Sequence, residues 1–402
     1  MRVLVVNCGS STLKFQLIDT TKEDAAPTSE RDLAHGVIER IGRQATLDFQ
    51  AGSNAYRHTA TIADHEEASR RVFAWLDTAG FLAPGGLDAV GHRVVHGGPD
   101  FVAPTRLDND VIAALTQLRE LAPLHNEPAL AAIQAAQAVL GSRVPMVAVF
   151  DTAFHSTVPA WAAQYAIPRS LATKYHLRRY GFHGLAHRSM SEGYAALTAT
   201  PLDQLKLITL QLGSGCSAAA IDAGRSVDTS MGFTPLEGLM MGTRSGDLDP
   251  ALPGFLARKE GVETAEVETW LNTRSGLLGV SERSGDMREL LAAAGQGDAG
   301  AELAVAMFCY RVRKYMAAYL AVLNGADAIL FGGGIGENAP EVRARICAKM
   351  DWCGLRLDTA RNTAVRGTPA RISTDDAKLH AYVMPVDEAH IIARDTAHCL
   401  GV

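Results

Sequence analysis

The feature that most constrains the fold is a pattern that occurs twice in the chain. Near the N-terminus, the apolar run 3–6 leads into a turn of small polar residues at 7–12, and a second strand-like run ends at Asp19. The same order recurs over 205–222, with its turn at 213–217. Short apolar runs bounded by turn residues are typical of buried strands. We interpret the pair as an internal duplication that predicts two similar β-rich lobes facing a shared cleft, although chance similarity between two hairpins would give the same pattern.

The turns themselves are suited to a phosphate group. Small residues let backbone N–H groups approach a phosphate closely, and hydroxyl groups add donors. Lys14 places one cation beside the first turn. This turn is not a Walker A loop, because G-x-x-x-x-G-K-[ST] is absent and a strand pattern, not a helix, follows the turn. An ordinary hairpin with a polar tip remains the alternative at this point.

A third turn of small residues occupies 332–338, after the short apolar run 327–331 and before a helix expected from about Pro340. A strand, a glycine turn and a helix N-terminus form an arrangement that binds phosphates or nucleotides. Three such turns favour a nucleotide held between two lobes over three unrelated turns.

Strand and helix patterns alternate along the rest of the chain. Asp64 can cap a helix, with Glu67 three residues further on. Pro128 suits the first turn of a helix from Glu127 to about Gly141. Residues 153–195 are expected to be irregular. The other expected elements are strands within 20–63 and at 88–95, 144–150 and 381–386, and helices at 110–121, at 301–323 and after 387–388.

Composition limits the class of protein. A chain of 402 residues, 47% hydrophobic and 20% charged, predicts an ordinary globular protein of about two domains. The net charge of −6 argues against a nucleic-acid surface, and no apolar run is long enough to span a membrane. No secretory signal is evident. The six cysteines are scattered without C-x-x-C, so neither zinc nor a disulfide framework is expected, and a reducing cytoplasm fits best.

Three side chains stand out as anion-binding candidates. Arg244 lies among glycines in the turn-rich block 228–250, where its guanidinium could grip an anion through two parallel hydrogen bonds. Arg93 ends a strand and precedes a glycine pair. His183 lies between glycines and could donate to a developing phosphoryl charge. By contrast, we expect His92 and His187 to be structural or surface groups, since neither has that setting.

Together these motifs resemble those of the acetate kinase family. The matching segments span nearly the whole chain, and they are 7–14, 91–98, 150–155, 179–184, 228–250 and 331–338. The resemblance implies an α/β fold of two duplicated actin-like (ribonuclease H-like) lobes around a nucleotide cleft, similar to the sugar kinases. One lobe would comprise 1–152 with a returning helix at 388–402, and the nucleotide-binding lobe would comprise 153–387.

The resemblance also implies an activity. It is the reversible, Mg²⁺-dependent transfer of a phosphoryl group from ATP to acetate, giving acetyl phosphate and ADP, with Mn²⁺ as a substitute metal and a homodimer as the expected assembly. Asn7 and Glu388 would belong to the metal site. Asp151, His183 and Arg244 would be the catalytic residues.

Further residues are carried over by position. Arg93 would bind the acetate carboxylate. The methyl pocket would be lined by Val95, Leu124, Phe182 and Pro235. The nucleotide would be held by Lys14, Gln211, Leu212, Gly213, Ser214, Gly215, Cys216, Asp286, Met287, Arg288, Gly334, Ile335, Gly336, Glu337 and Asn338.

Acetate chemistry constrains the role of Asp151. A carboxyl group has a pKa near 4, so acetate is already ionised at neutral pH and a general base has no proton to remove. Phosphoryl transfer depends instead on positioning and on neutralising charge. We therefore expect Asp151 to orient the metal shell or Arg244.

Departures from the family pattern leave alternatives open. Gln211 and Ser214 stand where the family usually has His and Asn, which leaves the preferred phosphoryl donor open. Leu185 and Ala186 replace Thr and Ser, and Ala389 replaces a second Glu. Propionate or another short acid could replace acetate, because one methylene changes binding by only about 1–3 kcal/mol. An actin-like ATPase without an acyl acceptor is the alternative from a different class.

Overall fold

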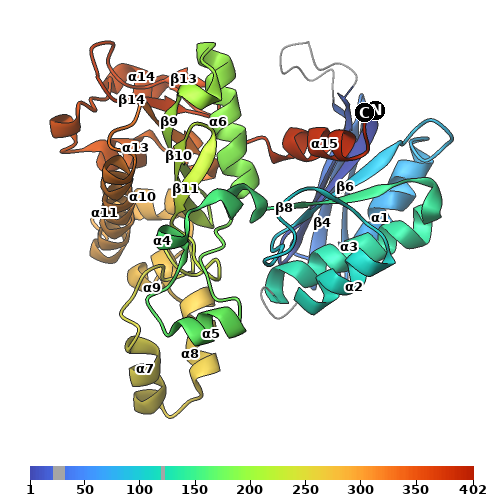
Figure 1. Ribbon diagram of the computed structural model, residues 1–402, viewed down its shortest axis with the longest axis horizontal. Helices are drawn as coiled ribbons and strands as arrows, with labels where there is room; N and C mark the ends of the chain where they lie inside the picture. Colours follow the sequence, from blue (N-terminus) through green and yellow to red (C-terminus); the bar gives the residue numbers. More distant parts are fainter. Residues whose placement is uncertain (21–31, 119–122) are drawn as a thin grey trace. The chain divides into compact units, whose positions relative to one another are not determined.

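The computed structural model describes residues 1–20, 32–118 and 123–402. These residues form two compact units. Unit 1 comprises Met1–Ala153 and Asp387–Val402, and unit 2 comprises Phe154–Val386 (Figure 1).

The described residues of unit 1 form an eight-stranded sheet in the order β5-β4-β3-β2-β1-β6-β8-β7. The strands are β1 (Arg2–Cys8), β2 (Thr12–Asp19), β3 (Asp32–Glu39), β4 (Gln44–Ala51), β5 (Asn54–Thr61), β6 (Ala89–Val94), β7 (Thr105–Arg106) and β8 (Met146–Phe150). Strands β1 to β5 pair antiparallel, whereas β1, β6 and β8 run parallel. The predicted opening hairpin is confirmed, with Asn7 opposite Lys14.

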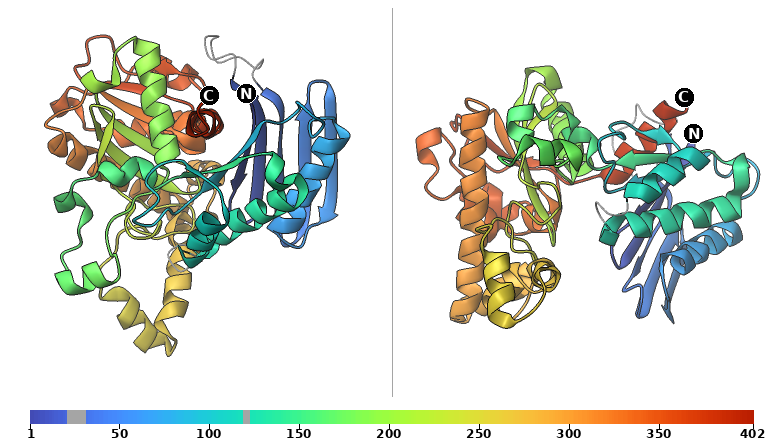
Figure 2. Two further views of the ribbon diagram at one scale, coloured as in Figure 1. Left: turned by 45° about the vertical axis from the view of Figure 1, so that its right-hand side comes forward. Right: turned by 60° about the horizontal axis from the view of Figure 1, so that its bottom comes forward.

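Helices cover both faces of this sheet. Successive residues of a strand point to opposite faces, so a strand that is buried throughout needs a packing partner on each side. Val90 belongs to the core shared with α1 (His65–Thr78) and α3 (Pro123–Leu140). Its neighbour Gly91 faces α15 (Glu388–Cys399), where a Cβ would collide with Thr396 and Ile392. The short helix α2 (Asn109–Gln117) lies on the side of α3, as Figure 2 also shows.

The described residues of unit 2 form a six-stranded sheet in the order β11-β10-β9-β12-β14-β13. Its strands are β9 (Lys206–Leu212), β10 (Cys216–Asp222), β11 (Arg225–Thr229), β12 (Ala328–Gly332), β13 (Ala370–Arg371) and β14 (His380–Val383). Three antiparallel strands, β11-β10-β9, continue into the parallel series β9-β12-β14. The same topology runs through β3-β2-β1 and β1-β6-β8 of unit 1, which confirms the duplication.

Two long helices lie against this second sheet. Helix α6 (Gly184–Thr198) packs Met190 and Tyr194 on Leu207 and Leu330, and α11 (Ala299–Val322) contacts β9 and β10 (Figures 1 and 2). The remaining helices of unit 2 are α4 (Ala160–Ala163), α5 (Arg169–Lys174), α7 (Leu252–Glu260), α8 (Thr264–Thr273), α9 (Gly276–Ser281), α10 (Met287–Gly295), α12 (Gly333–Asn338), α13 (Pro340–Cys347) and α14 (Thr359–Ala364). Nowhere in the described ranges is a helix both long enough and apolar enough to cross a bilayer.

Three local predictions were wrong. Helix α3 begins at Pro123 and not at Glu127, so Pro128 lies inside the helix and the first-turn preference applies to Pro123. The supposedly irregular 153–195 contains α6, whose buried face includes small polar residues that hide its periodicity. The glycine turn 332–338 is helical over Gly333–Asn338. The end of the helix predicted at 110–121 lies outside the described residues.

Candidate active site

In unit 1, the predicted site residues come from neighbouring strand ends. Asn7, Arg93 and Asp151 lie at or just after the carboxyl ends of β1, β6 and β8, which are adjacent and parallel. Glu388 begins α15, whose N-cap is Asp387. Carboxyl ends of parallel strands meet at one edge of a sheet, and this edge is where ligands bind in open α/β sheets. Lys14 is exposed on β2 opposite Asn7.

Arg93 connects this cluster. Its Nη1 donates to Asn7 Oδ1 at 3.0 Å, and its Nη2 forms a very short ion pair with the fully buried Asp151. The Asn7 amide in turn donates to Glu388 Oε2 at 3.0 Å. Burial lowers the pKa of Arg93, but the carboxylates of Asp151 and Glu388 outweigh it, so the net shift is upward and the guanidinium stays charged.

The same residues fit a magnesium ion. Burial raises the pKa of Glu388, although Arg93 opposes the shift, so a cation would favour its ionised form. Asp151 Oδ1 is buried and has no hydrogen-bond partner in the described structure. Mg²⁺ prefers such oxygen ligands and takes only one or two carboxylates beside water and substrate phosphates. The described residues contain no cluster of three His, Cys, Asp or Glu that could hold a metal ion.

In unit 2, the segments around Gly242, Gly285 and Gly333 converge at the end of the β9–β10 hairpin. The Gly242 N–H donates to the Ser214 carbonyl at 3.0 Å. A Cβ on Gly242 would lie 3.2 Å from the Gly285 carbonyl oxygen, and one on Gly333 would lie 2.7 Å from the Leu212 carbonyl oxygen. Glycine is required at 333, where φ is +73°, and it eases the close approach at 242. These approaches bring the segments predicted to hold the nucleotide, 213–216, 286–288 and 334–338, to the same end of the sheet.

Arg244 and His183 meet beside Gly215. A Cβ on Gly215 would lie 3.4 Å from His183 Nε2 and 3.5 Å from Arg244 Nη2. Arg244 donates to the Pro235 carbonyl at 2.8 Å and is paired with no carboxylate in the described part of the chain. Burial lowers its pKa, with Cys216 opposing. A partly buried arginine without a counter-ion is a strong anion-binding feature, because a bound anion would supply the missing charge.

Other predicted nucleotide residues have structural partners. Glu337 Oε1 accepts from the Gly333 N–H at 3.0 Å and from the Val386 N–H at 3.2 Å. Asn338 Nδ2 donates to the Gly334 carbonyl at 3.1 Å. The exposed Arg288 pairs with Asp286 at 2.6 Å, at the start of α10.

The methyl-pocket residues are divided between the units. Val95 is buried in unit 1, and Leu124 is in α3 of the same unit with its side chain outside the described set. Phe182 and Pro235 are in unit 2, where Phe182 is 1% exposed. The pocket therefore stays a prediction.

Sequence reasoning missed the residues that hold these loops. Buried Arg343 donates to the carbonyls of Gly336 and Glu337, each at 2.9 Å, and thereby satisfies the end of α12. Arg179 donates to the Ser230 carbonyl at 3.0 Å and pairs with Glu237 at 2.6 Å, which fixes the 228–250 block. Arg179 and Glu237 lie inside recognised motifs, whereas no local signal points to Arg343.

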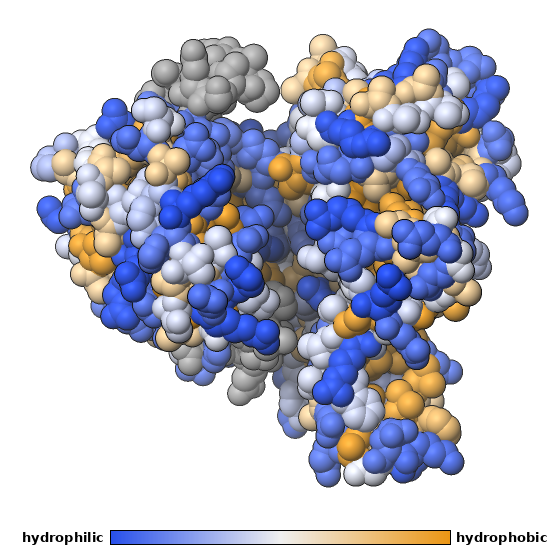
Figure 3. Space-filling view, turned by 180° about the vertical axis from the view of Figure 1, so that it is seen from behind, coloured by the Kyte–Doolittle hydropathy of each residue, from blue (hydrophilic) through white to orange (hydrophobic). Residues whose placement is uncertain are grey.

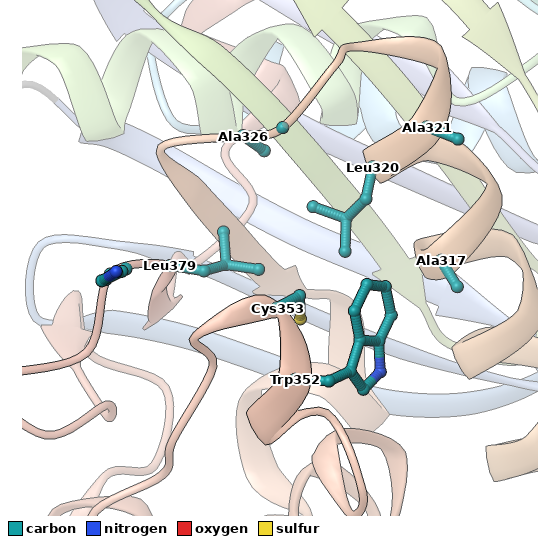
Figure 4. A pocket seen from close by; sticks show the side chains of 9 residues that line it. Ala317, Leu320, Ala321, Ala326, Trp352, Cys353 and Leu379 are labelled. Atoms are coloured by element: carbon teal, nitrogen blue, oxygen red, sulfur yellow. The ribbon is translucent and has the colours of Figure 1, made fainter.

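Two surface features of unit 2 lie apart from this site. A pocket of about 360 Å³ is lined by Leu320 of α11, Trp352 and Leu379 among others, and it contains none of the predicted site residues (Figure 4). Hydrophobic residues also gather toward the end of the unit that carries α7, where Leu252 and Phe255 are 42% and 47% exposed (Figure 3).

Fold and site together define an α/β protein of two duplicated halves, with Asn7, Asp151 and Glu388 gathered around Arg93 in one half and an arginine without a carboxylate partner beside a histidine in the other. The chain belongs to the acetokinase family, whose model matches residues 2–394.

Relatives and solved structures agree over full length. The acetate kinase of Solibacter usitatus is 47% identical, with 100% of this chain and 98% of the relative covered, and that of Methanosarcina thermophila is 45% identical, with 98% and 96% covered. The crystal structure of Porphyromonas gingivalis acetate kinase has a TM-score of 0.90 at 38% identity, with 99% of each chain covered. A propionate kinase from Francisella tularensis has a TM-score of 0.90 at 35% identity, also with 99% of each covered.

Proposed function

We propose that the chain catalyses reversible phosphoryl transfer between ATP and acetate, giving acetyl phosphate and ADP. The observation that carries the proposal is Arg244, a partly buried cation without a carboxylate partner in the described residues, next to His183 and Gly215. Family membership supplies acetate as the acceptor.

In this proposal a carboxylate oxygen of acetate attacks the γ-phosphorus of ATP in line, and the bond from that phosphorus to the ADP oxygen breaks. No proton moves in this step, because acetate is already ionised. Arg93 binds and orients the acetate carboxylate. Arg244 and His183 stabilise the charge on the transferring group's equatorial oxygens.

Asp151 has a narrower role in this scheme than a general base. Its ion pair with Arg93 supports a positioning function, since it fixes the guanidinium that receives acetate. Asn7 and Glu388 would hold Mg²⁺, directly or through water, with Asp151 Oδ1 as a further acceptor. When bound, Mg²⁺ would neutralise phosphate charge.

We further propose that unit 2 binds the nucleotide through 213–215, 286–288 and 334–338, and that the enzyme is a cytoplasmic homodimer. Supporting the first point, glycines bring these turns to one end of the sheet. For the location, all six cysteines are free, as is usual in a reducing compartment. Light scattering at micromolar protein would test the dimer.

The decisive test is trapping of the acyl phosphate by hydroxylamine, with ATP, Mg²⁺ and acetate as substrates. We expect acetyl hydroxamate at a rate far above that of ATP hydrolysis without acetate. Steady ATP hydrolysis with no hydroxamate from any short acid would refute the proposal and favour an ATPase.

Propionate is the second candidate acceptor. It is favoured by the similarity to the Francisella tularensis propionate kinase, and a pocket discriminates one methylene by only about 10- to 200-fold. Competition between the two acids at equal concentration, with the two hydroxamates separated, gives the ratio of kcat/KM directly.

A further inference from the structure

His183 takes part in a hydrogen-bonded chain of four side chains in unit 2. Its Nδ1 lies 2.9 Å from Ser217 Oγ, and Ser217 Oγ lies 2.8 Å from His187 Nε2. His187 Nδ1 in turn lies 2.7 Å from Thr209 Oγ1. Thr209, His187 and Ser217 are fully buried, so water cannot replace any partner within the chain.

The protonation state of His187 limits how this chain can be arranged. Burial, with His155 and His183 nearby, lowers the pKa of His187 well below its ordinary value. A neutral imidazole has one N–H and one lone pair. His187 therefore donates on one side and accepts on the other. Ser217 Oγ has no other hydrogen-bond partner in the described structure, so its proton goes to one histidine while it accepts from the other.

Thr209 decides between the two directions. Its hydroxyl has no partner other than His187 Nδ1 in the described structure. If His187 donated to Thr209, the threonine proton would stay buried without an acceptor, which is costly. Thr209 consequently donates to His187 Nδ1, His187 donates from Nε2 to Ser217, and Ser217 donates to His183 Nδ1.

We propose that Thr209, His187 and Ser217 are positioning residues that fix His183 as the tautomer protonated on Nε2. Nε2 is the nitrogen near Gly215 and Arg244, so its N–H would be the donor offered to the transferring phosphoryl group. Protonating Nδ1 would require the whole chain to reverse. This inference rests on the proposed function for its catalytic meaning, but the tautomer itself can be observed without any substrate.

The test combines a spectroscopic and a kinetic readout on the full-length enzyme. Protein labelled with ¹⁵N-histidine is examined by NMR near pH 8, and the His183 signals are identified by their loss in His183→Gln. We expect a neutral ring protonated on Nε2. In Thr209→Val, which removes the donor but keeps the shape, we expect a mixture of tautomers, and Thr209→Ser should restore the single one.

Activity should follow the tautomer. With both directions equally populated, kcat in Thr209→Val falls about twofold or more, with KM values unchanged. Ser217→Ala, which removes the contact to His183, should lower kcat about tenfold or more. Thr198→Val is the matched control, since its hydroxyl only donates to the Tyr194 carbonyl at 2.9 Å on the same helix, and it should change neither readout.

The wild-type spectrum alone can overturn the inference, and this matters if Thr209→Val folds poorly. A His183 protonated on Nδ1, or charged near pH 8, would contradict the direction of the chain. An unchanged His183 signal in folded Thr209→Val would contradict the role of Thr209. Failure of the hydroxamate assay together with the expected tautomer would instead refute the proposed reaction.

Discussion

Replacing Arg93 by alanine should separate its structural role from its role in substrate binding. Arg93 is 13% exposed and its partner Asp151 is fully buried. Removing the guanidinium leaves the Asp151 carboxylate buried beside Glu388 without a counter-ion. The second variant, Arg93→Ala with Asp151→Asn, removes that uncompensated charge as well.

The size of the effect follows from burial. Breaking a buried ion pair by deleting one partner costs about 3–5 kcal/mol. The lost hydrogen bond to Asn7 adds about 1 kcal/mol. We therefore expect Arg93→Ala to destabilise unit 1 by about 5 kcal/mol and the double variant to recover about half of that or more, while neither variant retains acetate-dependent activity.

The assay is urea unfolding with a reporter confined to unit 1. Trp75 lies against Phe15 and Phe49 in that unit, at ring distances of 5.7 Å and 5.4 Å. Replacing the other tryptophans, 161, 270 and 352, by phenylalanine makes fluorescence report on unit 1 alone. With a slope of about 2 kcal/mol/M, the midpoint should move by about 2.5 M.

The matched control is Arg57→Ala, which breaks an exposed ion pair with Asp48 on the same sheet. It should cost less than about 1 kcal/mol. If Arg93→Ala were no more destabilising than Arg57→Ala, or if adding Asp151→Asn recovered nothing, the reasoning about an uncompensated charge would be refuted.

Three further predictions test the site. Burial raises the pKa of Glu388, so the contribution of Glu388 to the stability of unit 1 is present at low pH and is lost as pH rises through that pKa. Glu388→Gln should therefore stabilise unit 1 near pH 8 and lose this gain below about pH 4, which urea unfolding measured against pH would show. The same variant should abolish Mg²⁺-dependent activity in a Mg²⁺ titration. Gly215→Ala should lower kcat about tenfold or more with a melting temperature near wild type, because its Cβ fills the space beside His183 and Arg244 without a severe clash. Ser214→Asn, which restores the family residue, should lower KM for ATP and leave KM for acetate unchanged in steady-state assays.

Much of the fold could be predicted because its signals are local. The two hairpins with their turns and the capped helix after Asp64 are each encoded within a few residues, and all are present. Pro128 and α6 were predicted wrongly because tertiary packing overrides local preference there. Small polar residues such as Ser189 and Ser191 are buried in α6, where a periodicity argument expects apolar ones.

The site was predictable only in part, for a physical reason. Sequence motifs identify groups that meet ligands, but they do not reveal which side chains hold those groups. His187, expected to be structural or at the surface, is separated from His183 by one hydroxyl group. Arg343 lies just beyond the glycine motif 332–338, outside the segment that matches the family pattern, and satisfies the carbonyls of α12. The links from His187 to Thr209 and Ser217 depend on how α6 packs on β9 and β10, which the spacing of residues does not reveal.

The duplication explains why the two halves need different charges. In unit 1, Asn7 near the end of β1 lies opposite Lys14 of β2 in the strand register. In unit 2 the equivalent position near the end of β9, Gln211, lies opposite Ser217 of β10. Unit 1 thus keeps an exposed cation and surrounds Arg93 with carboxylates, a set suited to a metal and an acid. Unit 2 replaces that cation by a hydroxyl group bonded to a neutral histidine chain. Because no carboxylate in the described residues neutralises Arg244, its charge remains available to the phosphoryl group. A carboxylate placed beside Arg244 would pair with the guanidinium and weaken its interaction with that group.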